Sequence, residues 1–277
     1  MTQRHEPGPE GPHDKAHLVD QLMKLADDLA RETGDLQRSR LAGARQIKTK
    51  TSATDLVSDV DCEAERWIVS RLSEARPDDS ILGEEGTLRE GTSAVRWVID
   101  PLDGTTNYVY GYPAFAVSIA AEIDGVPQIG VVYDTVAGRC YRAVSGCGAF
   151  CEDRPIKVTQ QADLARALVG TGFSYDAAQR RMQGSALALI LGRVSDIRRS
   201  GSAALDLCHV ASGQLDAYWE LDNAPWDYAA ASVIAREAGA VVELAPACHG
   251  RGPAVVAANS SLMSAFLALL REAGVLA

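Results

Sequence analysis

One segment constrains the fold of this 277-residue chain most strongly, because it joins a predicted buried strand directly to acidic residues. Residues 95–99 are mostly β-branched or aromatic and predict the strand, and D-P-L-D-G-T-T-N follows over residues 100–107. Pro101 bends the chain, so Asp100 and Asp103 leave the end of one strand together. Two carboxylates at a strand end predict a cleft in which both can share metal ions.

The residues after this strand point to the same kind of site. Alone, Asp100 or Asp103 would more often be a turn or helix-cap residue than a metal ligand. The whole string D-P-x-D-G-[ST]-x-N is expected by chance at about one start position in ten million. Gly104 allows the backbone to approach a ligand closely, and Thr105 can open a helix whose free N–H groups favour a phosphate.

Helices and strands are predicted along most of the chain. In the first half, helical spacing predicts helices over residues 18–29 and 60–73, with a loop-like stretch at 48–61 before the second. Residues 115–144 predict an antiparallel meander with a hairpin turn at Asp124-Gly125. Further strands are expected at 80–82, 168–171, 194–198, 215–220, 241–244 and 255–257, and further helices at 175–191, 203–211, 225–239 and 262–270.

This order of elements predicts an α/β (α+β) layered sandwich with mixed and antiparallel sheets. We expect a disordered tail at 1–15, an N-terminal α+β half at 16–160 that carries the metal-site loops, and a C-terminal α/β half at 161–277. The halves are expected to pack as one catalytic domain. With 47% hydrophobic residues, the chain can bury a sizeable core.

Charge and terminal composition limit the partners and the compartment. The formal charge of -10 argues against broad attraction to nucleic acid or to an anionic membrane, so we expect neither as a partner. The first residues are polar and proline-containing, with no apolar stretch typical of a signal peptide or membrane span. The six cysteines form no C-x-x-C pair, which favours buried thiols in a reduced protein. The expected location is the cytoplasm.

The D-P-L-D-G-T-T-N segment resembles the first signature of the inositol monophosphatase family of magnesium-dependent, lithium-sensitive phosphomonoesterases. G-E-E-G at 83–86 resembles the family's G-E-E element, and W-D-Y-A-A at 226–230, followed by E-A-G-A at 237–240, resembles its second signature. Lys50 and Asp61 stand where the family has its lysine and the last aspartate of its D-L-V-x-x-x-D loop. The resemblance runs from about Ala16 to the C-terminus.

The resemblance implies a homodimer with an αβαβα sandwich of the inositol monophosphatase and fructose-1,6-bisphosphatase type. It implies two to three Mg²⁺ per site. Glu84, Asp100 and the Leu102 carbonyl would bind the first, and Asp100, Asp103 and Asp227 the second. Glu84 would help to hold a weaker third.

The same resemblance implies a mechanism without a phosphoenzyme. Water on the first metal would be oriented by Glu84 and by Thr105, which is hydrogen-bonded to Asp61, and would attack phosphorus in line. The second metal would stabilise the departing alkoxide.

The residue types agree with this chemistry. Four carboxylates in one cleft, about 4 Å from their neighbours, would repel by roughly 4 kcal/mol per pair at an effective dielectric near 20, so they need cations or raised pKa values. Ligands that are all oxygen, without Cys or His, favour Mg²⁺ over Zn²⁺. An acidic protein could attract an anionic substrate through such ions.

The substrate is less constrained than the chemistry. The resemblance places Gly104, Thr105 and Lys50 near the substrate, and matches Glu220 and the stretch Gly201-Ser202-Ala203 to positions that contact a sugar or polyol. Glu220 would accept hydroxyl hydrogen bonds and so favour a polyol phosphate. We therefore expect Mg²⁺-dependent hydrolysis of myo-inositol monophosphate to inositol and phosphate.

Two alternatives stay open. The same chemistry could act on fructose 1,6-bisphosphate, histidinol phosphate or a nucleotide 3'-phosphate, although Thr106, where related subfamilies usually carry lysine, disfavours the last two. The chain could instead serve mainly as an interaction protein of the transcription machinery, since some bacterial members that resemble it are ribosomal-RNA antitermination factors.

Overall fold

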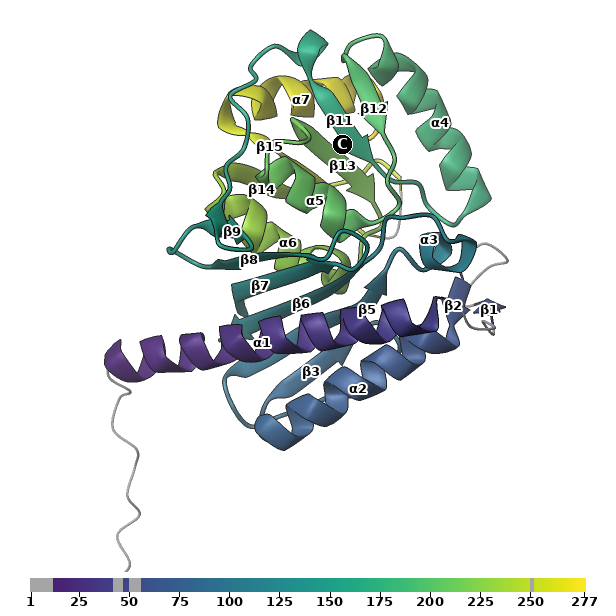
Figure 1. Cartoon of the computed structure of the whole chain (residues 1–277). Coiled ribbons are helices and arrows are strands. Elements are labelled where there is room, and N and C mark those ends of the chain that lie inside the picture. Colours follow the sequence, from purple (N-terminus) through teal and green to yellow (C-terminus); the bar gives the residue numbers. More distant parts are fainter. Residues whose placement is uncertain (1–11, 42–46, 50–55, 250–251) are drawn as a thin grey trace, which may run out of the picture.

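The structure is a computed structural model that describes residues 12–41, 47–49, 56–249 and 252–277. Two sheets are stacked with helices between them and on both outer sides (Figure 1). Helices α1 and α2 cover the outer face of the larger sheet, α5 and α6 lie between the sheets, and α4 and α7 cover the smaller sheet. The predicted layered αβαβα sandwich is therefore confirmed.

The larger sheet has eight strands in the order β10-β9-β8-β7-β6-β5-β3-β4. Only the pair formed by β3 and β5 is parallel, and the other pairs are antiparallel. Its strands are β3 (Ser80–Gly83), β4 (Leu88–Arg89), β5 (Val95–Asp103), β6 (Ala116–Ile123), β7 (Val126–Asp134), β8 (Arg139–Val144), β9 (Ala149–Cys151) and β10 (Arg154–Pro155). The helices of this half are α1 (Pro12–Arg40), α2 (Asp59–Ala75) and α3 (Thr105–Tyr110).

The smaller sheet has five strands in the order β12-β11-β13-β15-β14, parallel over the first three and antiparallel over the rest. Its strands are β11 (Leu168–Thr171), β12 (Asp196–Arg198), β13 (Ala217–Leu221), β14 (Ala240–Ala245) and β15 (Ala254–Asn259). The helices are the short η1 (Leu164–Arg166), α4 (Ala177–Leu191), α5 (Ala203–Ala211), α6 (Pro225–Glu237) and α7 (Ser260–Glu272). The division near residue 160 stays a prediction.

Small residues let α6 approach the larger sheet closely. A Cβ placed on Gly130 of β7 would lie 2.1 Å from the Ala230 carbonyl oxygen of α6, so a side chain there would push the two layers apart. The buried face of α6 carries Ala229, Ala230 and Ala231, which pack in the cluster between the sheets. The dense packing of this middle layer holds the start of α6 close to the end of β5.

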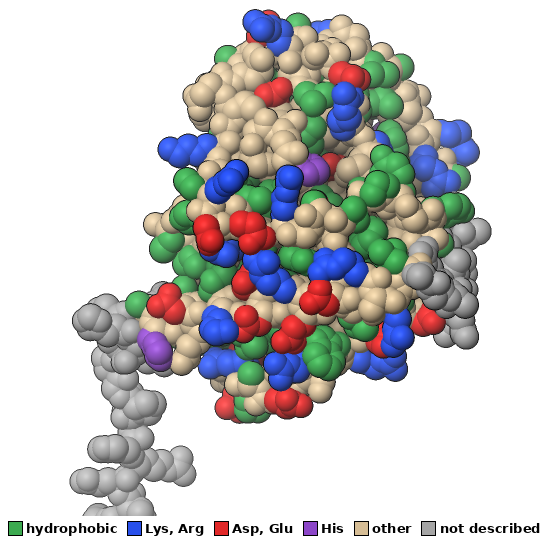
Figure 2. Space-filling view, in the orientation of Figure 1, with side chains coloured by type: hydrophobic (Ala, Val, Ile, Leu, Met, Phe, Trp, Pro, Cys, Tyr) green, Lys and Arg blue, Asp and Glu red, His purple; other side chains and the backbone are tan. Residues whose placement is uncertain are grey.

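The extent predicted for the first helix was wrong, whereas the helix predicted at 60–73 is confirmed as α2. The first helix spans Pro12–Arg40 rather than 18–29, because polar residues such as Thr33 and Gln37 are buried on it and an apolar pattern does not count them. Residues 12–15 of the predicted tail belong to this helix, and residues 1–11 lie outside the described part. Acidic and basic side chains alternate along its exposed face (Figure 2).

The predicted loop at 48–61 also contains regular structure. The strands β1 (Ile47–Thr49) and β2 (Leu56–Ser58) pair antiparallel, and α2 begins at Asp59, so Asp61 lies in the first turn of a helix. Three-residue strands are too short to show a periodic pattern. The turn predicted at Asp124-Gly125 is confirmed, with positive φ at both residues. No described helix is both long enough and apolar enough to cross a membrane.

Candidate active site

The strand β5 continues through both aspartates of the D-P-L-D segment and ends at Asp103. Its pairing with β6 shifts between Asp100, which faces Ser118, and Asp103, which faces Ala116. The extra residue on β5 makes a bulge, a feature that redirects side chains at sheet edges. Pro101 supplies no N–H to the ladder, so it is tolerated at this break.

Gly104 follows the bulge in a conformation that other residues rarely adopt. Its φ is 96°, and a Cβ there would lie 2.9 Å from the Ala114 carbonyl oxygen. The chain then enters α3 at Thr105, as the sequence predicts. Gly104 thus allows the turn that sets Asp103 beside the first residues of α3.

Asp103 links the two halves of the molecule. Its Oδ2 accepts hydrogen bonds from Ser202 Oγ at 2.5 Å and from the Ala204 N–H at 2.8 Å, both at the start of α5. Asp100 is nearly fully buried, and its Oδ1 accepts from the Leu102 N–H at 2.9 Å. One oxygen of Asp100 is therefore held by the local backbone, and one oxygen of Asp103 is held by the start of α5.

The other two predicted carboxylates reach the same place from different elements. Asp227 is the third residue of α6, and its Oδ2 accepts from the Ala224 N–H at 2.6 Å, which closes the start of the helix. The Glu84 N–H donates to the Ile99 carbonyl at 3.1 Å, so the loop after β3 is bonded to the end of β5.

The pKa directions indicate that these carboxylates interact. Burial raises the pKa of Asp100 well above its usual range, and the charges of Glu84, Asp103 and Asp227 raise it further. Burial raises the pKa of Asp227, and Glu84 and Asp103 add to the shift. Burial raises the pKa of Asp103 to about 7, although the bonds from Ser202 and Ala204 oppose the rise. These shifts support the predicted cluster of mutually repelling carboxylates.

The donor chemistry of this cluster fits a hard divalent cation. The candidate ligands are carboxylates, of which Asp100 and Asp103 are buried, and a bound cation would relieve the repulsion among them. Among the described residues, no three carboxylate, imidazole or thiol groups already converge as the ligands of an ion would. Mg²⁺ usually keeps several waters, so it requires few direct protein ligands.

A hydrogen bond joins the first turn of α2 to the start of α3. Thr105 Oγ1 donates to Asp61 Oδ1 at 2.7 Å, and it also lies 3.2 Å from the Leu102 carbonyl oxygen. Asp61 is fully buried. The structure therefore contains the Asp61 and Thr105 pair that the resemblance implies.

Glu220 occupies a space that a glycine leaves for it. Its Oε2 accepts a hydrogen bond from the Tyr218 hydroxyl at 2.6 Å. A Cβ on Gly172 of the β11 exit would lie 1.9 Å from the Glu220 carboxyl carbon. Burial raises the pKa of Glu220 to about 7, while the bond from Tyr218 and the charge of Arg199 oppose the rise.

Comparison with known proteins identifies the family. The sequence profile of the inositol monophosphatase family matches residues 18–274. This chain belongs to the inositol monophosphatase family. A Mycobacterium leprae protein named inositol-1-monophosphatase is 45% identical over 274 residues, covering 91% of this chain and 94% of that protein. A Vibrio cholerae protein named Nus factor SuhB is 41% identical over 224 residues, covering 80% of this chain and 84% of that protein.

Solved structures of family members have the same fold. Mycobacterium tuberculosis SuhB gives a TM-score of 0.80 at 40% identity, covering 94% of this chain and 99% of that one. The Thermotoga maritima inositol monophosphatase gives a TM-score of 0.82 at 30% identity, covering 92% and 98%. Membership in this family supports a phosphatase acting on small phosphate esters.

Two residues that the sequence does not single out hold segments of this candidate site in place. Glu65 of α2 accepts hydrogen bonds from the Glu85 N–H at 2.7 Å and from the Thr87 N–H at 3.0 Å, which fixes the loop that bears Glu84. A Cβ on Gly83 would lie 2.4 Å from a Glu65 oxygen. The sequence signal that could have identified Glu65 is its i, i+4 spacing from Asp61, which places both residues on one side of α2.

The second such residue, Asn107, lies inside the first signature of the family. Its Nδ2 donates to the Ala114 carbonyl at 2.6 Å and to the Ser200 carbonyl at 2.9 Å. The motif thereby holds the loop before α5, which contains Gly201 at φ 91°. Lys50, the remaining predicted contact, lies outside the described residues.

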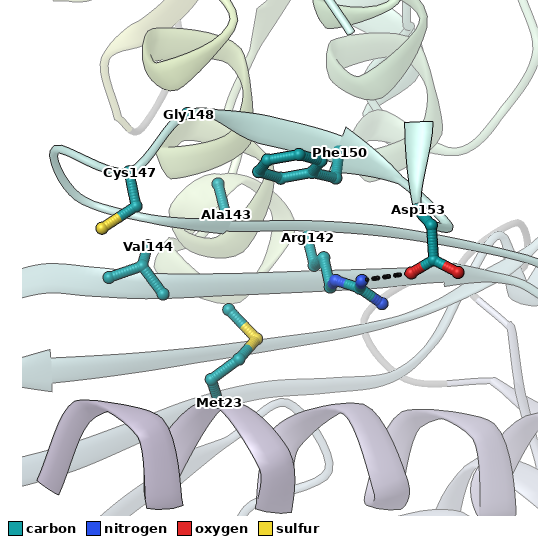
Figure 3. A pocket seen from close by; sticks show the side chains of 8 residues that line it. All are labelled: Met23, Arg142, Ala143, Val144, Cys147, Gly148, Phe150 and Asp153. Carbon is teal, nitrogen blue, oxygen red and sulfur yellow. Dashed lines mark hydrogen bonds and ion pairs between the residues drawn. The ribbon is translucent and has the colours of Figure 1, made fainter. Parts of the chain in front are cut away.

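A separate hollow of about 260 Å³ opens between α1 and the β8–β9 hairpin (Figure 3). Met23 points into it from α1, and Arg142 pairs there with Asp153 at 2.9 Å. None of the motif carboxylates lines this hollow. The candidate site is therefore marked by its clustered carboxylates and lies apart from this hollow.

Proposed function

We propose that this chain is a Mg²⁺-dependent phosphatase that hydrolyses a polyol phosphate, with myo-inositol monophosphate as the first substrate to test. The observation that carries the proposal is the cluster of carboxylates at the end of β5, in which burial and the neighbouring charges raise the pKa values of Asp100 and Asp227. Family membership supports hydrolysis of a phosphate monoester.

The carboxylates divide into two ligand sets in this proposal. Glu84, Asp100 and the Leu102 carbonyl would hold one Mg²⁺, and Asp100, Asp103 and Asp227 a second, with Glu84 helping to hold a third. When bound, Mg²⁺ supplies positive charge that attracts the phosphate and makes water more acidic. Backbone N–H groups hold one oxygen of Asp100, of Asp103 and of Asp227, and the second oxygen of each carboxylate would bind the metal.

The side chains around these ligands orient the reactants. The Thr105 hydroxyl donates its hydrogen bond to Asp61 Oδ1. The lone pairs of Thr105 Oγ1 can therefore accept a hydrogen bond from the attacking water. Glu84 would accept the second proton of that water. The Gly104 and Thr105 backbone, together with Lys50, would contact the phosphate.

The polyol would lie on the side of the smaller sheet. Glu220, held by Tyr218, would accept hydrogen bonds from its hydroxyl groups. Gly201, Ser202 and Ala203 would line the same side, since Ser202 is bonded directly to Asp103. These positions favour a substrate with several hydroxyls near the phosphate.

Further properties belong to the same proposal. We infer a cytoplasmic, lithium-sensitive homodimer that binds neither membrane nor nucleic acid directly. Fructose 1,6-bisphosphate, histidinol phosphate and a nucleotide 3'-phosphate are the alternative substrates. A role as an antitermination factor is the second candidate function, favoured by the 41% identity to the Vibrio cholerae Nus factor SuhB.

A substrate panel tests the proposed function. Phosphate release is measured from inositol, fructose, histidinol and nucleotide phosphates, each with Mg²⁺, with EDTA and with added Li⁺. We expect turnover that needs Mg²⁺, that Li⁺ inhibits and that favours inositol monophosphate. A folded protein that releases no phosphate from any compound would contradict the proposal and favour the interaction role. Capture of transcription components by an Asp103→Asn variant would then test that role.

A further inference from the structure

Gln37 of α1 makes a hydrogen bond to the backbone that lies between the two aspartates of the D-P-L-D segment. Its Nε2 donates to the Pro101 carbonyl at 2.7 Å. Pro101 and Leu102 fall inside the register shift between β5 and β6, where the ladder of the sheet is interrupted. A helix residue 64 positions earlier in the chain thus supplies a partner to the backbone at this break.

The amide group of Gln37 is fixed at both ends. Its Oε1 accepts a hydrogen bond at 2.6 Å from the hydroxyl of Thr135, the residue after β7. A carbonyl can only accept, so the amide nitrogen must be the atom that faces Pro101. Gln37 and Thr135 are both fully buried, and hydrogen bonds are stronger in such surroundings than in water. The side chain of Gln37 therefore has one defined orientation.

The same peptide group also holds the Asp100 carboxylate. The Leu102 N–H, which shares a planar peptide with the Pro101 carbonyl, donates to Asp100 Oδ1 at 2.9 Å. In a trans peptide the carbonyl and the N–H point in opposite directions, so a partner that fixes one also fixes the other. A donor at the carbonyl also polarises the peptide and strengthens its N–H as a donor. A chain of hydrogen bonds therefore runs from Thr135 through Gln37 to Asp100.

We propose that Gln37 is a positioning residue for the metal site, because it orients the Pro101–Leu102 peptide and through it the Asp100 carboxylate. This inference rests on the proposed function, since Asp100 is a ligand in both proposed Mg²⁺ sets. It assigns Gln37 no contact with substrate or with the reacting atoms. Loss of a group that orients a metal ligand typically weakens metal binding by about 10- to 100-fold.

The main chain of Gln37 offers a matched control. The Tyr108 hydroxyl donates to the Gln37 carbonyl oxygen at 2.9 Å, so this second buried bond ties the same residue to α3. Gln37→Met removes the side-chain donor and keeps an unbranched side chain of similar length, whereas Tyr108→Phe removes only the hydroxyl. Each variant loses hydrogen bonding in the interior, so both should unfold at lower urea concentration. Only Gln37→Met should act on the metal site.

Calorimetry with Mg²⁺ alone, on the full chain without substrate, gives the first measurement. We expect Gln37→Met to raise the Mg²⁺ dissociation constant about tenfold, equal to about 1.4 kcal/mol, and Tyr108→Phe to change it by less than about twofold. Activity of Gln37→Met on inositol 1-phosphate should recover at raised Mg²⁺, with the KM for the ester unchanged. Thr135→Val removes the bond that orients the Gln37 amide, so it should weaken Mg²⁺ binding in the same direction. It replaces Gln37→Met if that variant does not fold.

One NMR signal reports on the peptide itself. Pro101–Leu102 is the only Pro-Leu pair in the sequence, so ¹³C in the proline carbonyls and ¹⁵N in the leucine amides give a single correlated carbonyl–amide signal. We expect Gln37→Met to shift both frequencies, because the carbonyl loses its donor and the N–H becomes a weaker donor to Asp100. Tyr108→Phe should leave the signal near its wild-type position.

The opposite outcomes separate this inference from the proposed function. Wild-type affinity for Mg²⁺ in Gln37→Met, or an unchanged NMR signal, would overturn the inference and leave the proposed function intact. Equally weakened Mg²⁺ binding in Tyr108→Phe would also overturn it, because anchoring of α1 in general would then explain the effect. A folded wild type that binds no Mg²⁺ would overturn the proposed function and this inference together.

Discussion

The Thr105 hydroxyl donates a 2.7 Å hydrogen bond to Asp61, which connects the first turn of α2 to the first residue of α3. Asp61 is fully buried, and α3 begins directly after the bulged end of β5. The orientation of Thr105 is therefore set by a residue 44 positions earlier in the chain. The proposed water-orienting group depends on α2 as well as on the signature segment.

Removing this hydroxyl should impair catalysis more than folding. Thr105→Val keeps the shape of the side chain and removes the donor, so we expect phosphate release to fall about 100-fold, with Thr105→Ser restoring most of it. The loss of one hydrogen bond to a buried carboxylate should lower the free energy of unfolding by about 1–3 kcal/mol. The matched control is Thr106→Val, because the Thr106 hydroxyl is buried without a hydrogen-bond partner in the described part of the chain. A comparable loss of activity in that control would refute the role of Thr105.

Glu65 should act on the site through the loop that carries Glu84. Glu65→Gln exchanges one carboxylate oxygen for a donor, which opposes the N–H groups of Glu85 and Thr87. We expect the Mg²⁺ concentration for half-maximal activity to rise about tenfold, because displacement of the Glu84 carboxylate would weaken its contact with the ion. Glu63→Gln, on the same helix but in a part-exposed pair with Arg40, should change it little. An unchanged Mg²⁺ requirement in Glu65→Gln would show that Glu65 serves stability alone.

Gly172 should be required for the position of Glu220. In Gly172→Ala the new Cβ would lie 1.9 Å from the Glu220 carboxyl carbon, so the carboxylate must move. We expect a KM for inositol 1-phosphate raised about tenfold, with a smaller change in kcat. Gly184→Ala is the control, since nothing lies within 4 Å of a Cβ there and Gly184 is inside α4. That change should stabilise the protein by about 0.5–1 kcal/mol. A KM unaffected by Gly172→Ala would argue against polyol contact by Glu220.

Glu220 also predicts a pH dependence of stability. Its pKa is about 7 in the folded protein, above the ordinary 4.5, so folding favours the protonated form. The stability that this group contributes is present below pH 4.5 and is lost as the pH rises through about 7. Urea unfolding in EDTA should therefore show that Glu220→Gln gains stability relative to the wild type between those pH values. The exposed Glu243→Gln should show no such gain, and a constant difference for Glu220→Gln would contradict the raised pKa.

The parts of the site that the sequence predicted lie at strand and helix ends with local signals. Asp100 and Asp103 follow a β-branched run and a proline, and the Trp226-Asp227 pair follows Pro225 at the start of α6. These signals depend on neighbouring residues, so they can be interpreted without tertiary contacts. The layered fold was predictable for the same reason, from the alternation of strands and helices.

The missed features depend on contacts between distant segments. Glu65 is separated from the Thr87 N–H by 22 residues, and the space for Glu220 at Gly172 exists only once β11 and β13 pair. The length of α1 was underestimated because Gln37 is buried through a bond from its Nε2 to the Pro101 carbonyl. The assignment of Lys50 to the site stays a prediction.

The most direct test of the central claim is phosphate release from inositol 1-phosphate at increasing Mg²⁺, in the wild type and in Asp103→Asn. Asparagine keeps an oxygen that can accept from Ser202 and Ala204, so circular dichroism should show an intact fold. We predict Mg²⁺-dependent turnover in the wild type and a loss of about 100-fold or more in the variant, because it removes a charged ligand. Equal turnover by both proteins, or turnover that persists in EDTA, would contradict the account.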